Sequence, residues 1–174
     1  MAHRIEVGMK PDRPDAAGEA LRRRLAEDLG IAVDEVRVID VYTIAADLTP
    51  TELELVRREL FTDPIIQESA LDAALAKDFD YVVEVGFRPG VTDNVGRSAT
   101  EGIGDTVGRR MRPGEAVYKS TQYVFRGGVS RAACERMARD LLANELIQRW
   151  TVRSREELAR AGGTSLLGLP IVTE

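Results

Sequence analysis

The sequence is poor in the residues that most often carry enzyme chemistry or covalent cross-links. Its 174 residues include one cysteine, Cys134, and one histidine, His3. A single cysteine excludes a disulfide within the chain, and a histidine near a frayed terminus is poorly placed for a catalytic triad or a metal site. Position 134 falls on the apolar stripe of an expected helix, so we interpret Cys134 as a small core residue.

Long apolar runs and blocks of like charge are also missing. The net charge of −5 is spread over mixed signs, without the basic block that nucleic acid or an anionic membrane attracts. No apolar run approaches the roughly 20 residues of a membrane span. Residues 1–4 lead directly into a strand pattern rather than an apolar signal region. These features predict a cytoplasmic protein without nucleic-acid or membrane partners.

Motifs with a defined chemistry are scarce as well. The acidic residues mostly stand beside arginine or lysine on expected helix faces, and their spacing matches no metal-binding loop. Gly102, Gly104 and Gly108 do not follow a strand directly, so they fail the context of a phosphate-binding loop. They interrupt a helix that the sequence predicts from Asp93 to about Met111. We therefore expect no catalytic residue, no cofactor and no metal in this chain.

What the sequence does contain is an internal duplication. Ile5-Glu6-Val7-Gly8-Met9-Lys10-Pro11 is matched 78 positions later by Val83-Glu84-Val85-Gly86-Phe87-Arg88-Pro89. A second set of matches lies 81 positions apart and pairs Tyr42, Glu54, Arg58, Leu60, Ile66 and Gln67 with Tyr123, Glu135, Arg139, Leu141, Ile147 and Gln148. This period suits a small α/β module that pairs with a copy of itself. Because a half of about 75–80 residues would be marginally stable alone, we expect the halves to share a sheet or a face.

Each half predicts the element order β-α-β-β-α-β. Alternating apolar residues from Arg4 to Lys10 predict a strand, and an apolar stripe that stops at Gly30 predicts a helix. Residues 36–44 indicate two short strands or one strand bent at Asp40. Thr49-Pro50-Thr51-Glu52 is a helix start with a capping box, and Ile65-Ile66 is expected to open the last strand.

The second half repeats this order, with Leu146-Ile147 opening its last strand. We predict an α+β fold of two fused ferredoxin-like repeats with pseudo-two-fold symmetry, antiparallel sheets and helices on one face. The repeats are residues 1–71 and 81–152, joined by a linker, 72–80, in which a helical turn is expected. The C-terminal part, 153–174, is expected to hold a charged helix at 155–160 and an apolar tail at 166–172.

One stretch carries more polar residues than a turn requires. Arg88-Pro89-Gly90 ends a strand, and Asp93, Asn94 and Arg97 crowd the start of the next helix. Two interpretations of this stretch are open: an ordinary capped turn, or a contact surface for a partner or ligand. Two are also open for the glycines of the following helix: close packing inside the domain, or contact with a partner. The candidate partner interface comprises Arg88, Pro89, Gly90, Asp93, Asn94, Arg97, Gly102 and Gly104.

The motifs resemble a known family. Asp15-Ala16-Ala17-Gly18 and Asp93-Asn94-Val95-Gly96 stand at helix starts, and Asp63-Pro64-Ile65-Ile66-Gln67 and Asn144-Glu145-Leu146-Ile147-Gln148 precede the last strands. These motifs are similar to those of the PurS subunit of phosphoribosylformylglycinamidine synthase. The chain looks like two PurS-like units in tandem, as in the N-terminal region of the single-chain synthase. Glu145 departs from the pattern, which has proline there.

The resemblance implies a non-catalytic part of a ligase complex in purine biosynthesis. Such a module bridges an ATP-dependent synthetase and a glutaminase and supports ammonia transfer, so these two are the expected partners, and self-association is left open. The alternative is a duplicated ACT-like regulatory domain that binds a small molecule. Pro89-Gly90-Val91 resembles its ligand loop, although Thr92-Asp93-Asn94 is more polar than its usual helix start. An enzyme of ferredoxin-like fold ranks last, because no nucleophile or acid–base pair is found.

Overall fold

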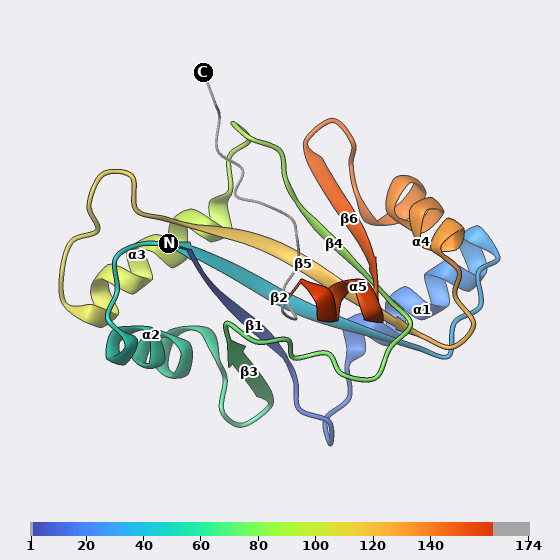
Figure 1. Cartoon of the computed structure of the whole chain (residues 1–174), viewed down its shortest axis with the longest axis horizontal. Helices are drawn as coiled ribbons and strands as arrows, with labels where there is room; N and C mark the ends of the chain where they lie inside the picture. Colours follow the sequence, from blue (N-terminus) through green and yellow to red (C-terminus); the bar gives the residue numbers. More distant parts are fainter. Residues whose placement is uncertain (1, 162–174) are drawn as a thin grey trace.

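A computed structural model describes residues 2–161, in which one antiparallel sheet of six strands is combined with five α-helices (Figure 1). The strands are β1 (His3–Met9), β2 (Glu35–Ala45), β3 (Gln67–Leu71), β4 (Tyr81–Phe87), β5 (Ala116–Arg126) and β6 (Gln148–Ser154). The helices are α1 (Ala16–Leu29), α2 (Pro50–Val56), α3 (Asn94–Val107), α4 (Arg131–Met137) and α5 (Arg155–Arg160). Two π-helical turns, η1 (Arg57–Phe61) and η2 (Ala138–Leu142), extend α2 and α4. The predicted α+β class is confirmed.

The two longest strands form the centre of the sheet. Its order is β3-β1-β2-β5-β4-β6, and β2 pairs with β5 over eleven residues, from Glu35 opposite Arg126 to Ala45 opposite Ala116. Residues 35–45 form one strand that continues through Asp40, so of the two expected alternatives the single strand is confirmed. The pairing of β2 with β5, which we call the seam, joins the two halves of the chain in one sheet.

Two apolar cores lie on the face of the sheet that α1 to α4 cover. In the first core, Leu21 and Leu25 of α1 pack with Val83 and Val85 of β4 and with Met137 of α4. The helix of one half therefore packs on a strand and a helix of the other half, because the seam brings them side by side.

In the second core, a helix of the second half packs on a strand and a helix of the first half. Ile103 of α3 packs with Ile5 and Val7 of β1 and with Leu53 and Val56 of α2. Each core thus depends on residues from both halves.

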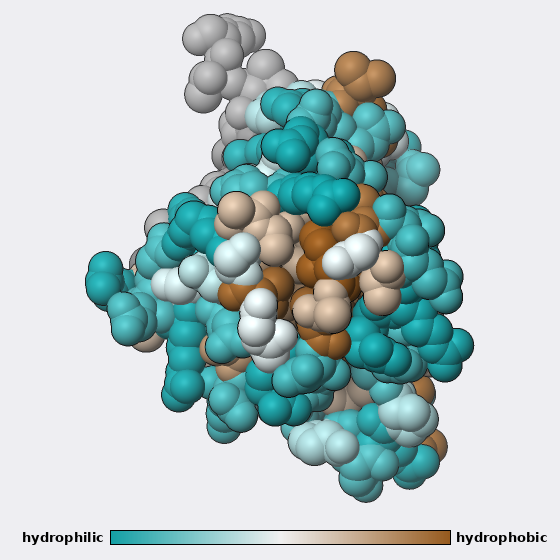
Figure 2. All heavy atoms as spheres, turned by 90° about the vertical axis from the view of Figure 1, so that its right-hand side faces the viewer, coloured by the Kyte–Doolittle hydropathy of each residue, from teal (hydrophilic) through white to brown (hydrophobic). Residues whose placement is uncertain are grey.

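The first core reaches the surface at one end of the molecule. Figure 2 shows apolar side chains gathered over the end that carries α1 and α4, with hydrophilic residues around them. Leu29, Ile31, Val129 and Ala133 are partly buried hydrophobic residues that pack against this core.

The opposite face of the sheet, here the back face, is covered by the segment 72–80 and by α5. Ala76 and Phe79 of this segment and Leu158 of α5 pack on Ile39 and Val41 of β2. The segment 72–80, which we call the strap, runs as bends without the expected helical turn. The expectation of helices on one face holds for α1 to α4, whereas α5 lies on the back face.

Several element ends differ from the prediction. Helix α3 stops at Val107 because Gly108 adopts a left-handed conformation, with φ +75°, and caps it. The last strand of each half begins two residues late, at Gln67 and Gln148, so the preceding apolar pairs lie in turns. The charged helix predicted at 155–160 is confirmed. The apolar tail at 166–172 lies outside the described residues.

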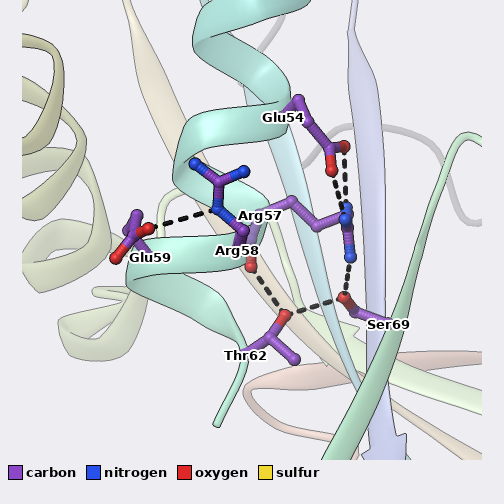
Figure 3. A network of polar contacts seen from close by, with 6 residues as sticks. All are labelled: Glu54, Arg57, Arg58, Glu59, Thr62 and Ser69. Carbon is purple, nitrogen blue, oxygen red and sulfur yellow. Dashed lines mark hydrogen bonds and ion pairs between the residues drawn. The ribbon is translucent and has the colours of Figure 1, made fainter. Parts of the chain in front are cut away.

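The π-helical turn η1 is tied to the edge strand β3 by a polar network (Figure 3). The Thr62 hydroxyl donates to the carbonyl of Arg57 (2.6 Å) and lies 2.7 Å from the Ser69 hydroxyl. The Arg57 guanidinium donates to the Ser69 hydroxyl (2.9 Å) and also binds the carboxylate of Glu54. These contacts position the chain between η1 and β3.

Candidate partner interface

Arg88 ties the end of β4 to the turn before β6. Its backbone N–H donates to the carbonyl of Ile147 (2.8 Å), and its Nε donates to the carbonyl of Glu145 (2.7 Å). Arg88 is exposed, but its guanidinium already has this structural partner. Lys10 is the residue that matches Arg88 in the first half. Its side chain makes the equivalent contact, because the ammonium donates to the carbonyl of Pro64 (2.6 Å).

The turn that follows and the start of α3 account for three further predicted residues. Pro89 and Gly90 are exposed, and Gly90 has φ +82°, a conformation that glycine adopts at little cost. The Asp93 side chain caps α3, with Oδ1 accepting from the N–H of Gly96 (2.8 Å) and Oδ2 from the N–H of Lys119 (2.7 Å). Both carboxylate oxygens therefore hold the fold together, which is the capped-turn interpretation.

The glycine of the Asp-x-x-Gly motif is required by a close contact between helix and sheet. A Cβ atom on Gly96 would lie 2.3 Å from the carbonyl oxygen of Val117, and one on Gly18 would lie 2.1 Å from that of Val36. Asp15 caps α1 as Asp93 caps α3. Both copies of the motif are thus architectural.

The first turn of α3 also presents side chains to the solvent. Asn94 and Arg97 are exposed, and Val95 between them keeps 51% of its surface accessible. Of the predicted interface residues with polar side chains, Asn94 and Arg97 are the two that make no side-chain hydrogen bond or ion pair among the described residues.

The two glycines inside α3 lie in different surroundings. Gly102 faces the side chain of Leu60, where a Cβ would lie 3.0 Å from Cδ1, so close packing of α3 on η1 accounts for it. Gly104 faces the backbone of Arg109, where a Cβ would lie 2.9 Å from the carbonyl oxygen. It also lines a hollow of about 610 Å³ bounded by Thr100, Asp105 and residues 108–111.

A feature that sequence reasoning missed is the apolar turn beside Arg88. Leu146 is 87% exposed and Ile147 is 40% exposed. The turn is fixed by its own side chains, because Asn144 accepts from the N–H of Leu146 (3.1 Å) and Gln148 accepts from the N–H of Asn144 (2.8 Å). A rigid turn therefore presents a large aliphatic side chain to the solvent.

The first half contains a turn of the same construction. Ile65 is 68% exposed, its N–H donates to Asp63 (3.0 Å), and the N–H of Asp63 donates to Gln67 (2.9 Å). The N–H of Lys10 donates to the carbonyl of Ile66 (2.9 Å), as that of Arg88 does to Ile147. The matched motifs carry the sequence signal for both turns, but their apolar residues resemble the start of a strand.

A half-buried polar group lies at the seam, on the helix-covered face. Lys119 Nζ lies 2.9 Å from the Asp40 carboxylate, 3.1 Å from the Thr121 hydroxyl and 5.8 Å from the centre of the Tyr42 ring. Burial raises the pKa of Tyr42 and of Tyr123, and the nearby Asp40 raises both further. The tyrosines were visible as matched positions, whereas the pairing of Asp40 with Lys119 depends on the strand register.

The single cysteine and the single histidine lie in different surroundings. Cys134 is fully buried, and burial raises the pKa of its thiol to about 12, so the thiol stays protonated. His3 Nδ1 lies 2.8 Å from Asp72 Oδ2. Within residues 2–161, no three His, Cys, Asp or Glu side chains are arranged to hold a metal ion.

None of the helices within residues 2–161 has the length and apolarity needed to cross a bilayer. No model of a known protein family matches the chain, and no curated protein matches it.

Proposed function

We propose that the chain is a non-catalytic bridging module of phosphoribosylformylglycinamidine synthase, linking a synthetase to a glutaminase in a cytoplasmic complex of purine biosynthesis. The observation that carries this proposal is the pair of matched turns that expose Ile65 and Leu146. Both turns are held by the same hydrogen bonds, although they lie 81 positions apart in the sequence.

Rigid exposure of an aliphatic side chain favours binding. A single exposed apolar residue is common on protein surfaces. Here, however, an Asp or Asn, a Gln and a Lys or Arg hold each turn in one conformation. An anchor residue that is ordered before binding loses little conformational entropy when it enters a partner's pocket.

We further propose that the chain is two PurS-like units fused into one polypeptide, with a pseudo-two-fold axis at the seam. Outward from the seam the strands follow the order β2, β1, β3 on one side and β5, β4, β6 on the other, which supports the proposal. The matched caps of α1 and α3 support it too.

The synthetase or glutaminase would contact the corner formed by the start of α3 and the turn at 144–147. Arg88 connects the two, because it follows β4, leads into the loop before α3 and binds the turn. Figure 1 shows this loop and this turn at the same end of the sheet, where β4 ends and β6 begins. Asn94, Arg97 and Leu146 supply the exposed polar and apolar contacts.

Binding of purified synthetase and glutaminase to this chain, measured by interferometry, tests the proposal. We expect Arg97→Glu to weaken association by tenfold or more without lowering the melting temperature, because the side chain is exposed. Arg24→Glu is the matched control, since Arg24 is an exposed arginine on α1, outside the proposed corner. Absence of binding by the unmodified chain, with stabilisation by an amino acid or nucleotide instead, would favour the regulatory alternative.

A further inference from the structure

A buried ionic cluster on the back face plays no part in the proposed interface. Glu6 of β1 and Glu84 of β4 are 0% and 2% exposed, and Arg4 of β1 is 8% exposed. Charged side chains are rarely buried to this degree unless they are paired. The arrangement of these three residues therefore has consequences for stability.

One guanidinium serves both carboxylates. Arg4 Nε donates to Glu6 (2.7 Å), and the two terminal nitrogens of Arg4 bind both oxygens of Glu84, one of them at 3.2 Å. The remaining Glu6 oxygen accepts from the N–H of Leu75 in the strap (3.0 Å). The cluster thus connects the first half, the strap and the second half.

The cation of this cluster is not duplicated. Glu6 and Glu84 are matched residues 78 positions apart, but the position that corresponds to Arg4 is Val82. Two equivalent buried acids therefore share a base supplied by one half. Gln122, which faces Glu84 from β5, is 1% exposed, and its Oε1 has no hydrogen-bond donor among the described residues.

The other charged groups on this face are distributed over the flanking strands. Strand β6 places Arg149 and Arg153 on either side of Thr151, the residue opposite Glu84. On β2, Arg37 pairs with Glu68 of β3 (2.8 Å). The strap contributes the exposed Asp72, Lys77, Asp78 and Asp80 together with the apolar Leu75, Ala76 and Phe79. Asp72 accepts from the backbone N–H of Arg4 (2.8 Å). Arg4 is in direct contact with both acids.

We propose that Arg4 is a clamp that holds the two halves and the strap in one arrangement, and that without it the buried acids become a proton-dependent switch. With Arg4 present, its guanidinium donates to both acidic side chains. Without it, two acids share a buried site that lacks its cation, and the cost of the buried charge falls when one acid takes up a proton.

The sign of the pH dependence distinguishes the variant from the wild type. In the wild type, the Arg4 guanidinium donates to both buried acids and offsets the cost of their burial, so we expect no gain in stability from this cluster on acidification. In Arg4→Val, we expect the folded state to bind more protons than the unfolded chain between pH 7.5 and pH 5.5. Its stability then increases as the pH falls. Valine is the residue that occupies the corresponding position in the second half.

Urea unfolding of the full chain at pH 7.5 and pH 5.5 tests the proposal. We expect Arg4→Val to lower the folding equilibrium constant about 100-fold or more at pH 7.5, as for a buried pair that loses one partner, and to regain part of this at pH 5.5. Arg4→Val/Glu84→Gln should be more stable than Arg4→Val at pH 7.5 and lack the gain at pH 5.5. Arg23→Val, at an arginine whose side chain is 68% exposed, is the control and should follow the wild type.

Two outcomes would overturn the clamp. One is a loss of stability on acidification in Arg4→Val that parallels the wild type. The other is a double variant no more stable at pH 7.5 than the single one. If Arg4→Val does not fold at pH 7.5, folding at pH 5.5 and folding of the double variant support the proposal, and failure of both contradicts it.

Discussion

At the residue scale, the motifs most visible in the sequence serve the architecture first. Asp15 and Asp93 each cap a helix and also bind the backbone of the adjacent central strand, at Val38 and Lys119. Such local roles are predictable, since an Asp before a helix is a known cap. The second bond to the strand is not, because it depends on how closely the helix approaches the sheet.

The close approach at Gly96 leads to a stability prediction. Gly96→Ala would place a methyl group 2.3 Å from the Val117 carbonyl oxygen, so the helix has to move away from the sheet. We expect a loss of about 1–3 kcal/mol in the free energy of unfolding, the usual range for overpacking. Ser98→Ala, at an exposed position of the same helix, is the control and should change little in the same urea titration. Equal stability of the two variants would contradict the packing argument.

Burial of Cys134 predicts slow chemical modification. Because burial raises its pKa to about 12, the thiolate that reacts with disulfide reagents is rare at pH 8. We expect labelling by such a reagent to be slow in buffer and complete within the mixing time in denaturing urea. Rapid labelling of the folded protein would show that this helix opens readily.

At the element scale, elements with strong end signals were predictable and those with conflicting signals were not. The capping box at Thr49 and the run at 155–160 marked their helices correctly. The apolar pairs at 65–66 and 146–147 looked like strand starts, yet Asp63 and Asn144 turn the chain by binding the backbone two residues ahead. The π-helical turns had no recognised signal in the sequence.

The network at η1 predicts unequal effects of two substitutions. Thr62→Val removes the hydroxyl that links Arg57 and Ser69, and we expect it to cost about 1 kcal/mol, as for a partly buried hydrogen bond. Glu54→Gln should have a smaller effect, because its ion pair with Arg57 is exposed and screened by solvent. Hydrogen exchange of the β3 amides measures both, and faster exchange in Glu54→Gln than in Thr62→Val would contradict this ranking.

At the scale of the whole molecule, the halves are interwoven. The matched segments of the sequence lead us to expect that the halves share a sheet or a face, and the structure has one sheet. The exchange of α1 and α3 between halves could not be predicted, because it follows from the register of β2 on β5. The same register brings Asp40 to Lys119.

Shared cores predict cooperative unfolding. Since each core contains residues from both halves, neither half can unfold without exposing the apolar surface of the other. We expect one transition, with superimposable curves from the fluorescence of Trp150 and from far-ultraviolet circular dichroism. Two separate transitions would show that the halves are independent.

The most direct test of the bridging function is the mass of the complex that this chain forms with synthetase and glutaminase, measured by sedimentation. We expect one species containing all three proteins, and its loss in Leu146→Asp, whose melting temperature should equal that of the wild type because Leu146 is 87% exposed. Glu145→Asp, at the adjacent exposed position, should assemble normally. If the three unmodified proteins sediment separately, the chain is not the bridge proposed here.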